Sequence, residues 1–419
     1  MRMLEGTAAE AYVNELQGRG SLLDEIEPMV RRIIDDVRTH RDEALSRYAR
    51  EFDGLGPDQK LRVEESELKN AWKHAPAKLK SALRIASENI RQFCEWQKPK
   101  EWRCSRNGIT LGQIVRPLDS VGCYVPGGRF PLVSTLLMTV IPAKVVGVKR
   151  IRVVSPRPSS EVLAAAGMLG VSEFYRVGGA QAIAAFAYGT DILARVDKIV
   201  GPGNLYVTAA KKLVSFDCAI DMLAGPTEVV IVSSKGNPAF IAADLVAQAE
   251  HDPETLAVFI TTSKKLGASV VSTLQEGGRG RPPLHNNEIA QKSLGNRGAA
   301  LIAGSHAQAF EWANRIAPEH ITVEKKDLSL VHNAGSVFIG EYSAQAAGDY
   351  ASGPNHVLPT AGAARFRGGL SVMDFVKLIS VQELSSKGLK QMAPAIIRLA
   401  ETEGLQAHAD SIRVRCANA

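Results

Sequence analysis

Apolar residues recur every three or four positions through long parts of the first hundred residues. One such stripe runs from Ile26 to Tyr48 and a second from Leu79 to Phe93. This spacing is typical of amphipathic helices that place one face on a core. We therefore expect the N-terminal part of the chain to form a helical layer that packs against the remainder.

From about Val121 the pattern changes to short β-branched runs that alternate with helical segments. The expected strands are 121–125, 151–155, 174–177, 198–200, 228–232, 257–261, 299–302, 320–323 and 336–339. The helical segments between them include 133–146, 160–169, 181–188 and 239–250. Strand–helix alternation predicts βαβ units, and hence an α/β protein whose parallel sheets are covered on both faces.

This number of strands suits two α/β units better than one sheet, and the turn Ala224-Gly225-Pro226 is the expected junction. Beyond Asp374 the pattern becomes helical again and ends in a short piece that starts near Leu399. The two units show no repeat in their sequences, so any symmetry between them would be structural.

Composition and charge narrow the class of protein further. The 419 residues are 45% hydrophobic, yet no apolar run reaches the roughly 20 residues of a membrane span and no secretory leader is found. Lys and Arg give a formal charge of +6 but are dispersed, so nucleic acid is not an expected partner. Five scattered cysteines without a CxxC pair disfavour disulfides and thiolate zinc sites. A cytoplasmic enzyme is expected.

Four histidines each lie close to a second polar residue in a predicted turn or element end. The pairs are Gln248 with His251, Glu319 with His320, Asp349 with His356, and Glu403 with His408. Amide, carboxylate and imidazole groups can bind zinc, imidazole can act as a base near neutral pH, and a carboxylate can activate water. Taken singly, such pairs more often cap helices or lie on the surface. Together they leave a metal site and a structural role equally open.

Two glycine-bearing turns, Tyr124–Gly128 and Gly201–Asn204, would allow the backbone to approach a nucleotide closely. The second opens a helix, where free N–H groups favour phosphate. Neither turn has the G-x-G-x-x-G spacing, and no acidic residue follows at the distance used to bind ribose. Taken singly, each turn is better explained as an ordinary helix start.

Taken together, these segments resemble the histidinol dehydrogenase family over almost the whole chain. The resemblance is carried by seven blocks: Tyr124–Gly128, Gly201–Thr208, Asp221–Glu228, Asp244–Pro253, Ala317–His320, Gly348–Thr360 and Ala400–His408. It implies a zinc- and NAD-dependent oxidation of L-histidinol to L-histidine through bound L-histidinaldehyde, which uses two NAD and is the last step of histidine biosynthesis. It also implies a homodimer.

The resemblance implies roles for individual residues. It gives His320 as the general base and Glu319 as the group that activates water. One zinc ion per subunit would be bound by Gln248, His251, Asp349 and His408. The NAD site would be lined by Tyr124, Gln181 and Asn204. Beside the metal ligands, the substrate would contact Ser134, Thr227, His320, His356 and Glu403.

The resemblance also implies how the chain is divided. Two doubly wound, incomplete Rossmann-like domains would comprise 21–122 with 228–372, and 123–227 on the NAD side. An N-terminal helical segment, 1–20, would pack with the C-terminal part, and 373–398 would be helical. The extension 399–419 would reach the partner subunit, where Glu403 and His408 would complete the neighbour's site.

Thr227 stands where members of the family usually have serine. The extra methyl group keeps the hydroxyl but is worth about 1–3 kcal/mol of discrimination in a pocket. A paralogous zinc and NAD dehydrogenase of the same fold, acting on another small polar alcohol, is therefore an alternative. The presence of Glu319, His320, His356 and Glu403 argues against it. A catalytically silent binding protein is disfavoured because none of the implied ligands is lost.

Overall fold

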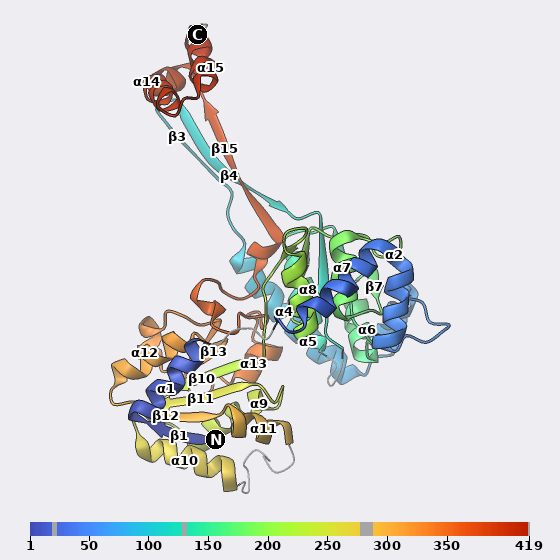
Figure 1. Cartoon of the computed structure of the whole chain (residues 1–419), viewed down its shortest axis with the longest axis vertical. Helices are drawn as coiled ribbons and strands as arrows, with labels where there is room; N and C mark the ends of the chain where they lie inside the picture. Colours follow the sequence, from blue (N-terminus) through green and yellow to red (C-terminus); the bar gives the residue numbers. More distant parts are fainter. Residues whose placement is uncertain (19–22, 128–131, 277–287, 418–419) are drawn as a thin grey trace.

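The computed structural model describes residues 1–18, 23–127, 132–276 and 288–417, and shows two α/β domains from which a long arm projects (Figure 1). Each domain contains a six-stranded sheet covered by helices. Among the described residues, no helix is long and apolar enough to cross a membrane. The α/β class with two parallel-sheet domains, expected from the alternation of strands and helices, is confirmed.

One sheet defines what we call the Tyr124 domain, and its strand order is β2-β7-β6-β5-β8-β9. Only β2 is antiparallel to its neighbour. The strands are β2 (Arg62–Val63), β5 (Ser120–Tyr124), β6 (Arg150–Val154), β7 (Glu173–Tyr175), β8 (Lys198–Val200) and β9 (Ala219–Ile220). The helices are α2 (Glu27–Asp53), α3 (Glu65–His74), α4 (Ala77–Gln97), α5 (Val133–Val145), α6 (Ser160–Met168), α7 (Gly179–Tyr188) and α8 (Leu205–Val214).

The second sheet defines the His320 domain, with the order β1-β12-β11-β10-β13-β14 and all neighbours parallel. The strands are β1 (Arg2–Glu5), β10 (Glu228–Val232), β11 (Leu256–Thr261), β12 (Ala299–Ile302), β13 (His320–Val323) and β14 (Ser336–Ile339). The helices are α1 (Gly6–Gln17), α9 (Pro238–Ala249), α10 (Lys264–Glu276), α11 (Glu288–Asn296), α12 (His306–Ile316) and α13 (Gln345–Tyr350). Every residue of β10 and β11 is buried, because helices cover both faces of the sheet.

The two sheets have the same winding. Counted from β5 or from β10, five parallel strands lie in the order 3-2-1-4-5, with one further strand at the edge. In such a sheet the order in which strands are added reverses between the first and fourth strands, and the carboxyl ends there form a crevice that suits ligands. In the Tyr124 domain this crevice lies between β5 and β8, which end at Tyr124 and Val200. The symmetry between the units is therefore structural.

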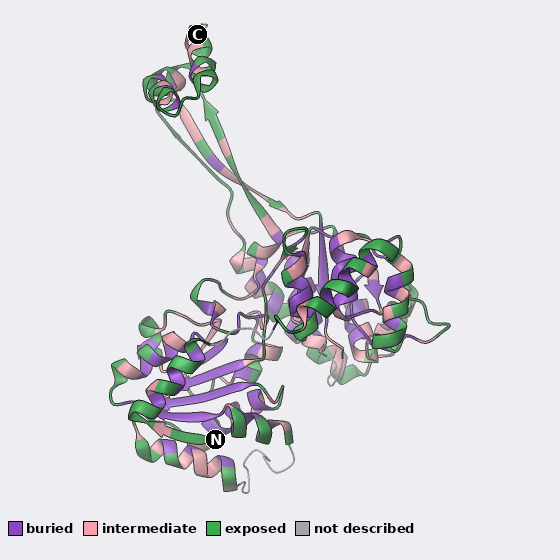
Figure 2. Ribbon diagram, viewed as in Figure 1, coloured by how far each residue is buried: buried purple, intermediate pink, exposed green. Residues whose placement is uncertain are grey.

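The arm is a three-stranded antiparallel ribbon that carries two helices at its tip (Figure 1). It consists of β3 (Trp102–Arg106), β4 (Ile109–Pro117), β15 (Val376–Leu384), α14 (Ser386–Thr402) and α15 (Gln406–Ala417). Asn107 and Gly108 connect β3 to β4 with φ values of 52° and 80°, as a two-residue hairpin turn requires. Most of the arm is exposed (Figure 2), including apolar side chains such as Trp102 and Leu378.

The grouping of segments differs from the expected one. Helix α2 packs on α7 and α8, and β2 pairs with β7, so the segments 27–97 and 120–124 lie in the Tyr124 domain and not with 228–372, while 102–117 belongs to the arm. The cause is the apolar stripe of α2, whose Val30 and Ile34 share a core with Ile183 of α7. The N-terminal residues start with a strand that pairs with β12 before α1 begins. The expected boundary near residue 20 lies outside the described residues.

The expectation of a helical segment over 373–398 was wrong for its first half. Residues Val376–Leu384 form β15, which pairs with β4 along its whole length, and α14 starts only at Ser386. The chain then breaks between α14 and α15, after Thr402 rather than at 399. The sequence of β15 mixes apolar and polar residues without a buried run, since both of its faces are largely exposed. Its strand conformation is stabilised by pairing with a distant segment.

Asp244 lies on α9 with its side chain partly buried, and burial raises the pKa of its carboxyl to about 6. Because this pKa exceeds the ordinary value of 3.8, the contribution of Asp244 to stability is full below about pH 4 and is lost as the pH rises through about 6. Asp244→Asn should therefore raise the free energy of unfolding at pH 8 by roughly 1–3 kcal/mol and change it little at pH 4. Denaturant unfolding at both pH values measures this. The exposed carboxylate variant Asp252→Asn is the control, and an equal gain at both pH values would contradict the prediction.

Candidate active site

Glu319 and His320 lie side by side at the amino end of β13. Just before them, Ala317 has a left-handed backbone (φ 50°) that ends α12 and turns the chain toward the sheet. In the parallel ladder His320 pairs with Val229, so the two residues lie next to Glu228 at the start of β10. The site is thus at the amino edge of this sheet, opposite to the edge where ligands of open α/β sheets usually bind.

The carboxylate of Glu319 is buried and firmly oriented. Its Oε2 accepts hydrogen bonds from the Thr227 hydroxyl at 2.5 Å and from the Glu228 N–H at 2.9 Å. Burial raises the pKa of the Glu319 carboxyl, against the opposing effect of His320 and of these two donors. Both of these bonds go to the same oxygen, Oε2.

The imidazole of His320 lies between two carboxylates. Its Nδ1 is 3.2 Å from the carbonyl oxygen of Glu228 and 3.7 Å from Oε2 of Glu319, and its Nε2 is 3.6 Å from Oδ1 of Asp349. Burial alone would lower the pKa of His320, but the charges of Glu319 and Asp349 outweigh it and raise the pKa to about 9. In return, His320 holds the pKa of Asp349 below its ordinary value, although burial opposes this.

Three of the four implied metal ligands lie next to this pair. Gln248, at the end of α9, donates from Nε2 to Oδ2 of Asp349 at 3.2 Å, and its Oε1 lies 3.3 Å from the Thr227 hydroxyl oxygen, whose hydrogen goes to Glu319. His251 Nδ1 is 3.1 Å from the Gln248 carbonyl oxygen. An Nδ1–H that donates to a backbone carbonyl fixes the tautomer and leaves Nε2 for a metal. Because Gln248 and His251 are three residues apart at the end of α9, the His251 ring can cap the Gln248 carbonyl while both side chains lie beside this cluster.

His356 joins the cluster from the loop after α13. Its Nδ1 is 2.8 Å from the Asp349 carbonyl oxygen, and its Nε2 is 3.3 Å from Oγ1 of Thr135. Burial lowers the pKa of His356. Thr135 lies in the first turn of α5 beside the implied substrate contact Ser134, which is half-buried. Thr135 was not expected at this site, because no sequence signal links it to a histidine so far along the chain.

The implied NAD residues lie at the carboxyl edge of the other sheet. Tyr124 ends β5, and its buried hydroxyl accepts a hydrogen bond from the Gly179 N–H at 3.1 Å. Gln181, in the first turn of α7, is also buried and donates to Oδ2 of Asp53 at 3.0 Å. The same Asp53 oxygen accepts from the Gly178 N–H at 2.9 Å. Asp53 is a residue that the sequence analysis missed, and burial raises the pKa of its carboxyl.

Asn204 lies across the switch-point crevice from Tyr124 and is exposed. It caps α8, because its side-chain oxygen accepts from the Val207 N–H at 3.1 Å. The preceding Gly201 has a φ of 113°, and a Cβ there would lie 2.2 Å from the Tyr124 carbonyl oxygen. The two glycine-bearing turns are therefore in contact, although Gly128 of the first turn lies outside the described residues.

Glu403 and His408 lie on the exposed tip of the arm, away from the two sheets (Figure 1). The structure does not bring them together with the other implied site residues of the same chain. In keeping with this, no group of three or more His, Cys, Asp or Glu side chains suited to a metal occurs among the described residues.

Comparisons with known proteins identify the family. Residues 17–416 match the sequence model of the family described as histidinol dehydrogenase. The histidinol dehydrogenase of Methanothermobacter thermautotrophicus is 44% identical over 416 residues, which cover 96% of each chain. That of Bacillus anthracis is 44% identical, covering 96% of this chain and 95% of its own. The chain belongs to the histidinol dehydrogenase family.

The fold agrees with this assignment. The crystal structure of histidinol dehydrogenase from Elizabethkingia anophelis superposes with a TM-score of 0.93 at 33% identity, covering 100% of this chain and 98% of that one. Membership of the histidinol dehydrogenase family makes the chain an oxidoreductase. The family blocks occupy three places in the structure: the carboxyl edge of the Tyr124 sheet, the amino edge of the His320 sheet, and the arm tip.

The hydroxyl of Thr227 should matter for activity because it holds Glu319. Thr227→Val removes the donor while keeping the shape, and should lower kcat by about 10- to 100-fold, the value of a hydrogen bond to a charged group. Thr227→Ser keeps the hydroxyl and should stay within about threefold of the parent. Steady-state dehydrogenase kinetics of the three proteins measure this. Equal kcat values for the Val and Ser variants would show that the bond has no catalytic role.

Proposed function

We propose that this member of the family oxidises L-histidinol to L-histidine in two steps through bound L-histidinaldehyde, with one zinc ion per subunit and two NAD. This is the last step of histidine biosynthesis, and it takes place in the cytoplasm. The observation that carries the proposal is the buried pair Glu319–His320 beside Asp349 and Gln248. Such a cluster contains a base, a water-activating carboxylate and oxygen ligands at one place.

The donor groups present fit a zinc ion. Gln248 Oε1, His251 Nε2 and an oxygen of Asp349 would bind it from this chain, and they are the amide, imidazole and carboxylate ligands that zinc accepts. The hydrogen bond from His251 Nδ1 to the Gln248 carbonyl supports this role, because it presents Nε2 to the ion. When bound, zinc supplies a Lewis acid that holds the nitrogen atoms of the substrate.

His320 is the proposed general base, acting through Nε2. Its Nδ1–H donates to the Glu228 carbonyl, so the second ring nitrogen takes the proton from the substrate hydroxyl. With a pKa of about 9, however, the imidazole is protonated at neutral pH as long as the Asp349 carboxylate binds no other cation and pairs with it. A cation bound to Asp349 would withdraw that carboxylate and lower the pKa of His320 toward neutrality, where a base operates best.

Glu319 is the proposed group for the second oxidation. Thr227 and Glu228 hold Oε2, which leaves Oε1 to take a proton from the water that adds to the aldehyde. Burial raises the pKa of this carboxyl and so makes it a stronger base than an exposed glutamate. His356 and Ser134 would contact the substrate from the α13 loop and from α5.

NAD is the proposed hydride acceptor, bound at the switch point lined by Tyr124, Gln181 and Asn204. The residues present fit a dinucleotide: Gly201 brings the backbone close to Tyr124, and α8 begins at Asn204. The first turn of α5, the helix that follows Tyr124 in the chain, reaches His356 through Thr135. This contact supports an arrangement in which the nicotinamide end faces the Glu319–His320 pair.

A homodimer is proposed because Glu403 and His408 lie at the arm tip. The exposed apolar side chains of the arm, such as Trp102, Leu111 and Ile379, fit burial against a second copy. In that assembly the tail of one subunit would supply Glu403 and the fourth zinc ligand, His408, to the other. The alternative of a paralogue acting on another small polar alcohol rests on Thr227 alone, whose methyl group narrows the site.

The yield of NADH and two variants test the mechanism together. Complete oxidation of L-histidinol should give two NADH per substrate. His320→Asn should slow both hydride transfers by about 10²- to 10⁴-fold, because both need the base. Glu319→Gln should leave the first burst of NADH near normal and stall the second, because only the second needs water. Single-turnover stopped-flow measures both phases.

The opposite pattern would overturn these assignments. If Glu319→Gln abolished the first burst while His320→Asn left it intact, the carboxylate would be the base. A yield of one NADH per L-histidinol would show that the second oxidation does not occur. No NADH from L-histidinol would favour the alternative of a paralogue that acts on another small polar alcohol. If protein that elemental analysis shows to be free of metal turned over at the full rate, zinc would not be required for the reaction.

Mixing two inactive variants tests the exchange of tails. His320→Ala and His408→Ala chains should each be inactive as homodimers, and the His408→Ala homodimer should also bind less zinc. A hybrid would hold one site with both defects and one with neither, so mixing should restore part of the activity, while the zinc content stays at the mean of the two homodimers. Mass spectrometry first shows that the subunits have exchanged. If activity then fails to recover, His408 belongs to its own chain's site.

A further inference from the structure

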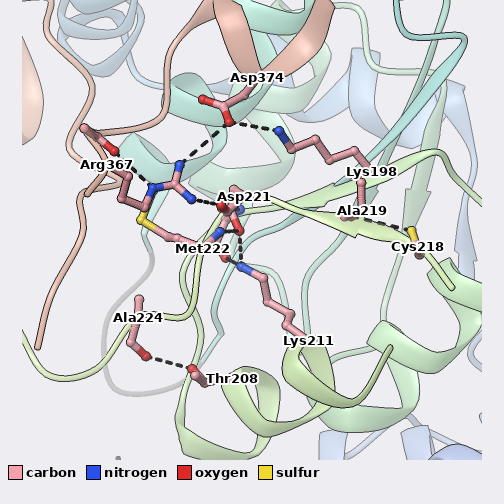
Figure 3. A network of polar contacts seen from close by, with 12 residues as sticks. Lys198, Thr208, Lys211, Cys218, Ala219, Asp221, Met222, Ala224, Arg367 and Asp374 are labelled. Carbon is pink, nitrogen blue, oxygen red and sulfur yellow. Dashed lines mark hydrogen bonds and ion pairs between the residues drawn. The ribbon is translucent and has the colours of Figure 1, made fainter. Parts of the chain in front are cut away.

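The backbone of Gly201 is held by a buried ion pair between Lys211 and Asp221 (Figure 3). Oδ2 of Asp221 accepts a hydrogen bond from the Gly201 N–H at 2.7 Å, and Nζ of Lys211 donates to the Gly201 carbonyl oxygen at 3.0 Å. Lys211 also donates to Oδ1 of Asp221. The two side chains are only 3% and 0% exposed. One ion pair thus fixes both polar groups of one backbone residue.

Gly201 occupies a demanding position. It follows the end of β8, and its φ of 113° is accessible to glycine and strained for other residues. It is pressed against the Tyr124 backbone, where a Cβ would meet the carbonyl oxygen at 2.2 Å. From here the chain runs directly to Asn204, the cap of α8. Any movement of Gly201 would therefore move the turn that faces the switch-point crevice.

The energetics of the ion pair indicate that it orients the backbone at Gly201 rather than stabilising the folded protein. Removing two charges from water costs several kcal/mol per ion, and replacing such a pair by apolar residues is often neutral or stabilising. The cost is offset here because Asp221 accepts three donors, from Lys211, Gly201 and the Met222 N–H at 2.5 Å. A well-packed parallel sheet does not need this arrangement for its core. What the ion pair determines is the backbone conformation of Gly201, through its hydrogen bonds to the Gly201 N–H and carbonyl oxygen.

The pair is itself supported from the root of the arm. Arg367 donates to the Asp221 carbonyl oxygen and lies 3.7 Å from Asp374, which accepts from Nζ of Lys198 at 2.9 Å (Figure 3). Lys198 is the first residue of β8. Both ends of β8 are thus hydrogen-bonded to polar side chains. At its start, Lys198 binds Asp374, which lies just before β15.

We propose that Lys211 and Asp221 are positioning residues that preform the Gly201–Asn204 turn for the dinucleotide. The inference rests on the proposed NAD site and adds to it residues that touch neither cofactor nor substrate. A turn that is already ordered does not have to be ordered on binding, and this raises affinity. Loss of the ion pair should consequently weaken cofactor binding and leave substrate binding unchanged.

The test compares Lys211→Met and Asp221→Asn with the parent protein. Isothermal titration with NADH, without substrate, should give a Kd at least about tenfold higher for each variant, in line with a lost buried hydrogen bond. The KM for NAD should rise likewise, while the KM for histidinol and the zinc content stay unchanged. The matched control is Arg152→Met, which breaks another mostly buried ion pair of the same sheet, with Glu173, and should leave the Kd for NADH as it is.

Each outcome separates the positioning role from the site itself. If Asn204→Ala weakens NADH binding but Lys211→Met and Asp221→Asn do not, the positioning role is wrong and the NAD site stands. If Asn204→Ala also has no effect, the NAD site is wrong. An equal loss in Arg152→Met would show a general structural effect and overturn the proposal. Should the two main variants not fold, Arg367→Gln decides: it removes a support of Asp221, so a Kd for NADH equal to that of the parent overturns the proposal.

Discussion

The parallel ladder between β10 and β13 determines the geometry of the candidate active site. Pairing of Val229 with His320 brings Thr227 and Glu228 next to Glu319, where a hydroxyl, an N–H and a carbonyl hold the carboxylate and the imidazole. The register of this ladder is set by side chains buried on both faces of the sheet. A slip of one residue would turn every side chain of the strand to the other face. The proposed catalytic pair, Glu319 and His320, is therefore positioned by the core and not by a flexible loop.

The segment from Asp221 to Thr227 joins the two domains and touches both sites. At its start Asp221 binds Gly201 of the proposed cofactor turn, and at its end Thr227 binds Glu319. Between them the Ala224 carbonyl accepts from Thr208, and the Gly225 N–H donates to Thr360. A short connection that is hydrogen-bonded along its length fixes how far apart the two sites lie. This matters for the proposed reaction, in which a hydride would pass from one site to the other within a single complex.

The sequence was sufficient to predict the strands that are buried on both faces, because a run such as 228–232 or 320–323 shows its apolar character locally. It was not sufficient for the arm, where β15 is an exposed strand stabilised by β4, although Asn107-Gly108 was an available hairpin signal. Local polar pairs pointed to the cluster around His320. Asp53, Thr135 and Asp221 were not assigned these roles, because their partners in the structure lie far away in the chain.

The pairing of β4 with β15 also dictates when the molecule can be completed during synthesis. One strand ends at Pro117 and the other begins at Val376, so a growing chain on the ribosome must be extended through β15 before the arm can form. The edge strand β1 waits in the same way for β12. Contacts between such distant segments close slowly and expose unpaired edges meanwhile. Until the partner strands β12 and β15 have been synthesised, the nascent chain therefore exposes unpaired strand edges to any chaperone that accompanies it.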